Sequence, residues 1–442
     1  MQEQVRIESL AYGGDGVGHL KDGRVVFVPG TCPGDEALVD YVVNKKDSFA
    51  KGKLSSIVEA SETRVKPLCE DAASLRCGGC PWAHVAYEEQ LRWKRQAVID
   101  AMVRIAKFDE SIARAVVREC LPSDKQWHYR NKVEFEVGQD VAGRLTLGMH
   151  ANAGGFTPLS TCQLCAKNLA KAPKALTGAL RVALGEEQAV IERVGVRYSE
   201  RTGDCEVAIW TQTGRFPRSR VAKIVSEAVP IKRPGVSRVL LKGDAKTRKV
   251  SGVESLAGHG CWEENIGEYT MWLSAPSFFQ VNTAGAEKLV ELVMDGLQPD
   301  GTDSVLDLYS GAGTFTLPLA EASLNVSAVE SAGSSVRDLR RNLERNGLYA
   351  EVIGGDVARE LPKLGHVDVA VVDPPRSGLA PEALDALIAT GAPRIAYVSC
   401  DPTTLARDLA KMLDAYRIVS INPVDLFPQT YHVENVAILD RR

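Results

Sequence analysis

The chain has 442 residues, of which 45% are hydrophobic and 25% charged, and its formal net charge is -4. One hydrophobic core rarely covers this length, so we expect two or three domains, and no apolar run approaches the roughly 20 residues that span a bilayer. The N-terminus has no basic start followed by an apolar core, as a signal peptide would. We therefore expect a cytoplasmic protein whose ten cysteines are free, metal-binding or catalytic.

Residues 1–58 alternate apolar and polar positions in short runs that are separated by glycine-rich or charged turns. This pattern predicts a small all-β barrel. The glycines between Tyr12 and Gly18 imitate a nucleotide-binding loop, but no helical pattern follows them. Without a helix N-terminus to hold phosphate, we interpret this segment as a turn.

A group of cysteines comes next, at Cys69, Cys77 and Cys80, with Cys162 or Cys165 as a possible fourth member. Four thiolates can hold zinc or an iron-sulfur cluster, and the number of ligands does not distinguish the two. The residues therefore predict a metal site and leave both the metal and the fourth ligand open.

Residues 59–275 are expected to form a central α+β domain. A helical pattern runs from 87 to 118, and strand patterns fill 127–275 except for helical stretches near 166–184 and 215–227. The helix expected at 88–118 can pack on the C-terminal domain despite its place in the sequence.

A basic segment lies within the central domain, where residues 231–250 contain seven cations and one anion, Asp244. These cations could contact RNA phosphates, or they could form the solvated face of a hairpin. The seven cations are Lys232, Arg233, Arg238, Lys242, Lys246, Arg248 and Lys249.

Residues 276–442 are expected to form a doubly wound α/β domain, because helical and strand patterns alternate from Thr283 onward. The expected parallel strands are 304–309, 325–330, 350–353, 367–372 and 394–399.

The ends of these strands carry residues suited to a cofactor. Gly311 and Gly313 follow the first strand, and glycine lets a backbone approach a ligand closely. Glu330, Asp356 and Asp373 follow the next three strands, at the sheet edge where doubly wound folds bind ligands. Such carboxylates can accept hydrogen bonds from ribose hydroxyls or from an adenine amino group. The pattern predicts a nucleotide or S-adenosylmethionine site.

Cys400 follows the fifth strand and so opens into the same crevice. A buried cysteine is usually inert, but here the sequence turns polar directly after the thiol. A thiolate that adds to carbon 6 of uracil makes carbon 5 nucleophilic enough to attack a sulfonium methyl group. Glu434 is the candidate base for removing the carbon 5 proton. The turn Asp373-Pro374-Pro375-Arg376 has arginine where amine methyltransferases often carry an aromatic residue, which favours a carbon target.

Together these motifs resemble the RNA (uracil-5-)-methyltransferases, bacterial enzymes that make 5-methyluridine in ribosomal or transfer RNA. The resemblance covers nearly the whole chain. It implies that residues 1–58 are a TRAM domain, an RNA-binding barrel similar to an OB-fold, and that 276–442 are a Rossmann-like domain dependent on S-adenosylmethionine. It also implies that the cysteine group holds a 4Fe-4S cluster and that Cys162, rather than Cys165, is the fourth ligand, although the seven-residue gap from Cys69 to Cys77 is longer than in the family.

The resemblance also assigns individual residues. The segment 277–282 is similar to a cofactor-contacting motif, and the segment 128–132 to one near the RNA. Cys400 is implied as the nucleophile and Glu434 as the base. The implied S-adenosylmethionine contacts are Gln280, Tyr309, Thr314, Glu330, Asp356 and Asp373.

Other functions are less consistent with the sequence. Radical S-adenosylmethionine enzymes need three closely spaced cysteines, which the spacing from Cys69 to Cys80 does not match. A non-catalytic RNA-binding assembly factor would not need Cys400 and Glu434. Because the barrel resembles a TRAM domain, we expect 23S ribosomal RNA as the substrate, with transfer RNA as the alternative and no obligate protein partner. A monomer is compatible with a complete set of motifs in one chain.

Overall fold

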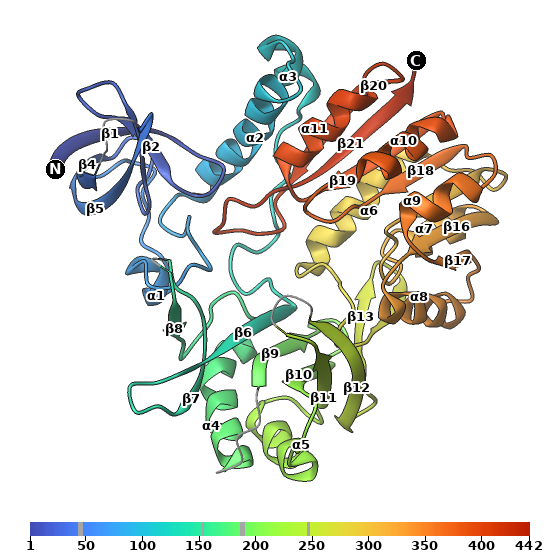
Figure 1. The fold of residues 1–442 in the computed structure, drawn as a ribbon, viewed down its shortest axis with the longest axis horizontal. Coiled ribbons are helices and arrows are strands. Elements are labelled where there is room, and N and C mark those ends of the chain that lie inside the picture. The colour runs from blue at the N-terminus through green and yellow to red at the C-terminus, as the bar shows by residue number, and fades with distance from the viewer. Residues whose placement is uncertain (43–46, 153, 186–190, 245–247) are drawn as a thin grey trace.

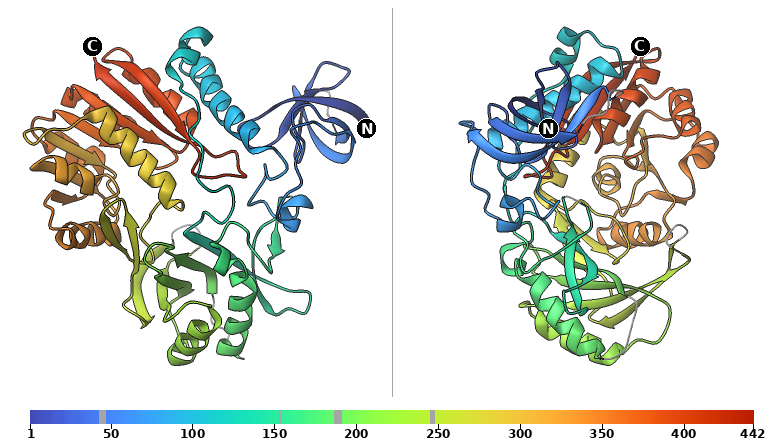
Figure 2. Two further views of the ribbon diagram at one scale, coloured as in Figure 1. Left: turned by 180° about the vertical axis from the view of Figure 1, so that it is seen from behind. Right: turned by 60° about the vertical axis from the view of Figure 1, so that its left-hand side comes forward.

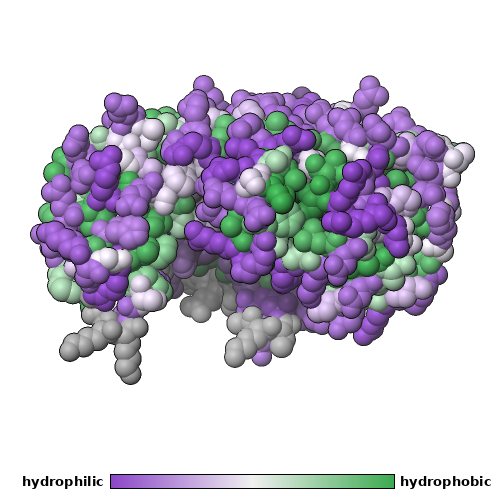
Figure 3. All heavy atoms as spheres, turned by 90° about the horizontal axis from the view of Figure 1, so that it is seen from above, coloured by the Kyte–Doolittle hydropathy of each residue, from purple (hydrophilic) through white to green (hydrophobic). Residues whose placement is uncertain are grey.

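The structure is a computed structural model, and it describes residues 1–42, 47–152, 154–185, 191–244 and 248–442. The molecule contains a small barrel, a central sheet and a C-terminal sheet covered by helices, and both of these sheets have seven strands (Figure 1). Seen from above, the barrel forms a lobe beside a larger body (Figure 3). Each helix in the described ranges is too short or too polar to span a bilayer.

The N-terminal part is a closed barrel of five strands in the order β1-β2-β3-β5-β4. Alternate residues of the strands point inward, and Val5, Ile7, Val26 and Val39 form its centre. Of the segment 12–18, which was expected to be a turn, residues 12–15 form the turn between β1 and β2, and residues 16–18 belong to β2. The strands are β1 (Gln2–Leu10), β2 (Gly16–His19), β3 (Val25–Val28), β4 (Glu36–Val42) and β5 (Phe49–Glu59).

The cysteine segment and two helices follow the barrel. The predicted helical stretch 87–118 is wrong in one respect, because Lys107 has a φ of +62° and interrupts it. Its longer helix packs on the C-terminal domain, where Val98 and Met102 join the same core as Leu405 and Leu409. The helices are α1 (Glu70–Ala73), α2 (Tyr87–Arg104) and α3 (Glu110–Val116).

The central part is a seven-stranded sheet in the order β12-β11-β10-β9-β6-β7-β8, with two helices over one face (Figure 2). Only β10 and β11 run parallel among its described strand pairs. Its elements are β6 (Lys132–Gln139), β7 (Leu145–His150), β8 (Phe156–Pro158), η1 (Lys167–Leu169), α4 (Ala172–Leu184), β9 (Ile191–Tyr198), β10 (Cys205–Gln212), α5 (Arg218–Ala228), β11 (Gly235–Lys242) and β12 (Lys249–Ala257).

The basic segment does not present all its cations to solvent. Arg238 is buried, donates to Thr211 Oγ1 at 2.7 Å and stacks on Phe216, so the expectation that it contacts phosphate is wrong. Its position on β11 turns this side chain toward α5 rather than toward solvent. Arg248 forms an ion pair with Glu192. Lys246 lies outside the described residues, and the exposed cations are Lys232, Arg233, Lys242, Arg248 and Lys249.

The C-terminal part confirms the expected doubly wound α/β fold. Strands β17-β16-β15-β18-β19 run parallel, and two antiparallel strands that the sequence patterns did not indicate extend the sheet in the order β19-β21-β20. A hairpin of β13 and β14 precedes this sheet.

These C-terminal strands are β13 (Trp262–Ile266), β14 (Tyr269–Leu273), β15 (Ser304–Leu308), β16 (Asn325–Glu330), β17 (Glu351–Gly354), β18 (Val369–Val372), β19 (Arg394–Ser399), β20 (Tyr416–Val424) and β21 (Glu434–Arg441). The helices are α6 (Thr283–Leu297), α7 (Thr316–Ala322), α8 (Gly333–Arg345), α9 (Val357–Glu360), η2 (Leu361–Lys363), α10 (Pro381–Thr390) and α11 (Pro402–Met412).

Candidate active site

The candidate site lies at the carboxyl edge of the parallel strands. Strand β15 pairs with β16 on one side and β18 on the other, so the order of strands reverses there. Ligands of doubly wound sheets bind at such a reversal because the loops from the two strands diverge and leave a crevice. Of the sequence-predicted residues, Tyr309 and Asp373 directly follow β15 and β18, and Glu330 is the last residue of β16.

Cys400 directly follows β19 and is partly buried. Burial and, after it, the nearby carboxyl groups of Glu434 and Asp373 raise the pKa of its thiol to about 12, although the Arg376 cation acts in the opposite direction. The thiol is therefore protonated at neutral pH in the free protein. A reaction that needs the thiolate must stabilise that negative charge.

Glu434 reaches Cys400 because β21 lies beside β19. Ser399 pairs with Asn435 in this antiparallel ladder, which puts the first residue of β21 next to the end of β19. Glu434 is 3% exposed, and burial followed by the nearby Asp373 raises its pKa to about 8. Burial also raises the pKa of Asp373 to about 7. A carboxyl group with this proton affinity is well matched to accept a proton near neutral pH.

Arg376 is the cation near the Cys400 thiol, and a hydrogen bond to His432 fixes its position. Its guanidinium Nη2 donates to His432 Nδ1 at 2.9 Å. Burial and then the Arg376 charge lower the pKa of His432 to about 4, so the imidazole is neutral and can accept this hydrogen bond. The arrangement leaves the positive charge of Arg376 near the thiol.

Tyr309 and the two glycines form a turn after β15. Tyr309 has a φ of +61°, a left-handed conformation that costs a non-glycine residue energy and often occurs at ligand sites. A Cβ on Gly311 would enter open space, which fits a close approach of a ligand. A Cβ on Gly313 would lie 2.8 Å from Leu339 Cδ1. Gly313 also has a φ of +107°, a conformation that favours glycine, and it packs closely against Leu339 of α8.

The carboxylates of Glu330 and Asp356 accept hydrogen bonds from backbone N–H groups. Glu330 accepts a hydrogen bond from Gly311 N at 3.0 Å and another from Ala332 N at 2.5 Å. Asp356 caps α9 by accepting from Ala358 N at 3.1 Å. Each carboxylate oxygen has a second lone pair, so both side chains keep acceptor capacity toward a ligand.

Gln280 and Thr314, the other two predicted cofactor residues, lie on different segments of the chain. Gln280 is buried in the segment before α6, and its carbonyl oxygen accepts from Asn131 Nδ2 at 2.9 Å. Thr314 follows Gly313 and is partly buried. The central domain therefore holds the segment of Gln280 directly.

Four of the predicted metal ligands line one cavity: Cys69, Cys77, Cys80 and Cys162. Cys165 does not line it and packs in the core of the central domain. A hydrogen bond with the Cys165 thiol lowers the pKa of Cys162, while burial raises the pKa of Cys77 to about 11. Among the described residues, however, no three His, Cys, Asp or Glu side chains gather closely enough to hold a single metal ion.

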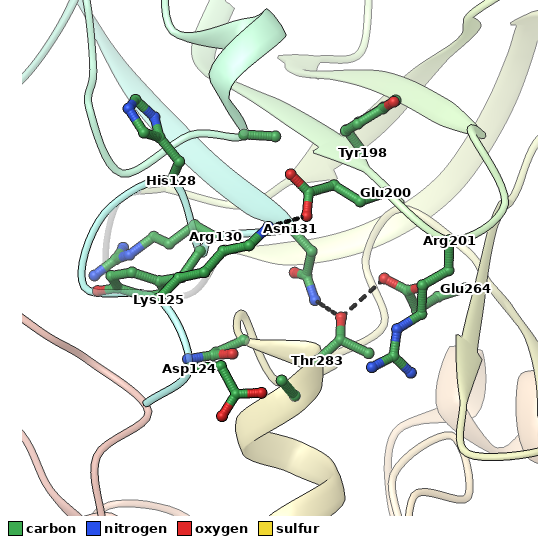
Figure 4. A pocket seen from close by; sticks show the side chains of 14 residues that line it. Asp124, Lys125, His128, Arg130, Asn131, Tyr198, Glu200, Arg201, Glu264 and Thr283 are labelled. Atoms are coloured by element: carbon green, nitrogen blue, oxygen red, sulfur yellow. Dashed lines mark hydrogen bonds and ion pairs between the residues drawn. The ribbon is translucent and has the colours of Figure 1, made fainter. Parts of the chain in front are cut away.

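A polar cavity of about 180 Å³ lies between the central and C-terminal domains (Figure 4). Asn131 Nδ2 donates to Thr283 Oγ1 at 2.9 Å, and Thr283 donates to the buried Glu264 at 2.9 Å. Lys125 pairs with Glu200 across another side of the cavity. These bonds join the segment just before β6 to α6 and β13, so the cavity wall is also a domain interface.

Comparison with known proteins gives the family. The model of the tRNA (Uracil-5-)-methyltransferase family matches residues 267–354 and 360–442. An RNA methyltransferase of uncharacterised function from Thermotoga maritima is 34% identical over 450 residues, covering 99% of both chains. A second, from Thermosynechococcus vestitus, is 36% identical and covers 99% of this chain and 97% of the relative. The chain belongs to the RNA (uracil-5-)-methyltransferase family.

A solved structure is similar over the whole methyltransferase. The crystal structure of the Pyrococcus abyssi tRNA (uracil-54, C5)-methyltransferase in complex with S-adenosyl-L-homocysteine is 27% identical, with a TM-score of 0.73. The match covers 99% of this chain and 100% of that one. The TRAM domain model matches residues 2–51, within the closed barrel. The TRAM-like barrel expected from the sequence is therefore confirmed.

Sequence reasoning missed some polar residues of the methyltransferase site. Asp307 lies fully buried in the middle of β15, where burial raises its pKa to about 7 and Thr316 donates to it at 2.6 Å. In the sequence, Asp307 is an acidic residue within an otherwise mostly apolar strand. This feature alone could have indicated a functional residue. The contact between Arg376 and His432 joins residues 56 positions apart, which no local pattern reveals.

Proposed function

We propose that this methyltransferase transfers the methyl group of S-adenosylmethionine to carbon 5 of a uridine in RNA through a covalent adduct with Cys400. The observation that carries the proposal is the placement of Cys400 beside Glu434 at the carboxyl edge of the sheet. A nucleophile and a group of raised proton affinity are the two parts that this reaction needs.

The reaction begins when the Cys400 thiolate, having lost its proton to solvent, forms a bond to carbon 6 of uracil. The charge of Arg376 favours that thiolate. S-adenosylmethionine supplies an electrophilic methyl group, which carbon 5 of the adduct attacks as the sulfur–methyl bond breaks. Glu434 then takes the proton from carbon 5, the bond from sulfur to carbon 6 breaks, and Cys400 leaves as the thiolate.

The cofactor residues are proposed from their positions at the strand ends. Glu330 and Asp356 would accept hydrogen bonds from the ribose and the adenine, and the open space at Gly311 would admit the ligand. S-adenosyl-L-homocysteine in the Pyrococcus abyssi relative supports this class of ligand. The full proposed set is Gln280, Tyr309, Gly311, Gly313, Thr314, Glu330, Asp356 and Asp373, with Gly313 acting through packing.

The target uridine must leave its RNA structure to reach Cys400, because a stacked base hides both faces of its ring. We propose 23S ribosomal RNA as the substrate on the basis of the TRAM domain. Transfer RNA is the second candidate, favoured by the Pyrococcus abyssi relative, which is named for tRNA and aligns over its full length. Mapping 5-methyluridine in both RNA classes from cells with and without the gene separates these alternatives.

We also propose that Cys69, Cys77, Cys80 and Cys162 hold a 4Fe-4S cluster. The four thiols line one cavity, and each thiolate of such a cluster binds a different iron. Cluster ligands therefore lie further apart than the ligands of a single ion, which is consistent with the lack of a single-ion site among the described residues. Its proposed role is to fix the fold or contact RNA, since methyl transfer needs no electron.

The cluster proposal is tested by iron and acid-labile sulfide content after anaerobic purification. Cys80→Ser should lose both, whereas Cys205→Ser, at a buried cysteine in β10, should keep both. Equal iron and sulfide in the Cys80 variant and the wild type would contradict the assignment.

The methylation proposal is tested by replacing the nucleophile. Cys400→Ala should abolish methyl incorporation into RNA while S-adenosylmethionine still binds. The wild-type enzyme should form an adduct with 5-fluorouridine RNA that survives denaturation, because the fluorine cannot leave as a proton does. Methyl incorporation by Cys400→Ala at the wild-type rate would end the covalent mechanism.

A further inference from the structure

The turn between β1 and β2 of the barrel reaches the loop that carries the nucleophile. The Tyr12 hydroxyl lies 3.4 Å from Asp401 Oδ2 and 3.5 Å from the carbonyl oxygen of Cys400. Both distances are long for hydrogen bonds from a hydroxyl, so a small movement of either loop would tighten one of them. A barrel residue is thus the neighbour of the peptide that links Cys400 to Asp401.

The turn is fixed by two further contacts. Trp82, in the cysteine segment, donates its indole N–H to the carbonyl oxygen of Gly14 at 3.0 Å and its backbone N–H to Gln429 O at 3.0 Å. Gly14 has a φ of +103°, and a Cβ there would lie 3.0 Å from the Tyr431 ring. The turn therefore cannot swing away from the C-terminal loop without breaking these contacts.

The aromatic ring of Tyr12 packs against the same loop. Its centroid lies 5.6 Å from that of Tyr431, with the rings at 84°, an edge-to-face arrangement that is favourable for aromatic pairs. This ring packing holds the turn between β1 and β2 against the C-terminal loop. The hydroxyl, which points on to Asp401, has no part in that packing.

Asp401 is itself held in place, which makes it a firm partner. Its Oδ1 caps α11 by accepting from Thr403 N at 2.8 Å and Thr404 N at 3.2 Å. Its Oδ2 is the atom that faces Tyr12. Burial raises the pKa of Tyr12, so the hydroxyl keeps its proton and remains a donor at physiological pH.

We propose that Tyr12 is a positioning residue whose hydroxyl, acting on Asp401 and the Cys400 carbonyl, sets the orientation from which Cys400 adds to the uracil ring. This inference rests on the proposed function. It assigns to the barrel a part in the reaction step in addition to RNA binding.

The test compares Tyr12→Phe with wild type, because phenylalanine keeps the ring and removes only the hydroxyl. We expect the rate of adduct formation with 5-fluorouridine RNA, at saturating RNA and S-adenosylmethionine, to fall about tenfold, as for the loss of one hydrogen bond. The KM for RNA, S-adenosylmethionine affinity and melting temperature should stay unchanged. Tyr41→Phe is the matched control, since that barrel tyrosine donates to Glu3 at 3.1 Å, away from the site.

A second comparison asks whether Tyr12 acts through Asp401. Asparagine also caps helices well, so Asp401→Asn should keep α11 folded. In that background Tyr12→Phe should have a smaller effect on adduct formation than in the wild type. Equal effects in the two backgrounds would place the acceptor elsewhere and overturn the inference.

Two other results would also overturn it: a wild-type adduct rate for Tyr12→Phe, or a slower rate together with a lower melting temperature and weaker S-adenosylmethionine binding. Failure of the wild-type enzyme to form any adduct would instead reject the proposed function. The two ideas are therefore tested separately.

Discussion

Arg376 is the cation that lowers the pKa of the Cys400 thiol, and it opposes burial and three carboxyl groups, those of Glu434, Asp373 and Asp401. Its hydrogen bond to a neutral His432 fixes its direction without neutralising its charge. The balance of charge around a single sulfur atom thus depends on one side chain.

We predict that Arg376→Gln slows alkylation of Cys400 about tenfold at pH 8, because less thiolate is present when the cation is removed. The rate should be recovered at higher pH. Alkylation of the Cys400 peptide by iodoacetamide, followed by mass spectrometry, measures this directly. Arg340→Gln, at an exposed arginine on α8, is the control and should react as wild type does. An unchanged alkylation rate in Arg376→Gln would show that the Arg376 charge does not lower the pKa of the Cys400 thiol.

Glu434 links the site to the pH dependence of stability. Its pKa of about 8 in the folded protein lies above the ordinary value of 4.5, so folding favours the protonated form. That stability is fully present below pH 4.5 and is lost as the pH rises through about 8.

Glu434→Gln should therefore melt at a higher temperature than wild type at pH 8.5, by on the order of 2 °C, and at the same temperature near pH 4.5. Thermal unfolding of the ligand-free proteins across this range measures the difference. The same variant should lose turnover, because glutamine is not a base. A constant difference in melting temperature at all pH values would point to packing rather than titration.

At the scale of elements, α2 is tied to the C-terminal loop by a fully buried ion pair. Lys94 Nζ lies 2.5 Å from Asp425 Oδ1, and both side chains are 0% exposed. Lys94 also donates to the carbonyl oxygen of Phe427 at 3.1 Å. The loop that leads to Glu434 is therefore anchored by a helix from the first third of the chain.

Lys94→Met should lower the free energy of unfolding by about 3–5 kcal/mol, because it leaves the Asp425 carboxylate buried without its cation. Denaturant unfolding measures the loss. The matched control is Lys363→Ala, at an exposed pair with Glu360, for which we expect about 1 kcal/mol or less. A similar small effect for both variants would mean that water reaches Asp425.

The elements also indicate what a sequence can and cannot predict. The parallel strands were predictable because each is a short, mostly apolar run after which glycine, proline or polar residues begin within a few positions, as after Leu308 and Val372. Strands β20 and β21 were not, because their pairing joins segments around a loop that lacks a hairpin signal. Tyr12 was interpreted only as part of a turn, since its partner Asp401 lies 389 positions away. Charge runs are similarly ambiguous, as the buried Arg238 demonstrates.

At the scale of the whole molecule, Asn131 of the central domain supports the segment that carries Gln280, one of the proposed cofactor residues. Its side chain bonds both Gln280 O and Thr283 Oγ1, and its backbone N–H donates to Val281 O at 2.8 Å. The segment before α6 is thus shaped by a residue of another domain (Figure 4).

Asn131→Ala should weaken S-adenosylmethionine binding about tenfold, because two hydrogen bonds that hold the Gln280 segment are lost. Isothermal titration calorimetry gives the dissociation constant. Asn325→Ala, which removes an exposed asparagine bond to Ser304, should leave that constant unchanged. Unaltered binding in Asn131→Ala would indicate that the segment keeps its shape without the central domain.

Strand β21 follows β20 in the sequence but lies between β19 and β20 in the sheet, so the last of these three strands to be made occupies the interior position. During synthesis, β19 and β20 leave the ribosome before the strand that must separate them. A nascent chain therefore has no complete site until residues 434–441 have been made, because Glu434 lies on the last of the three strands to leave the ribosome. Without β21, strands β19 and β20 would each lose a hydrogen-bonded neighbour, and Cys400 would lack its partner carboxylate.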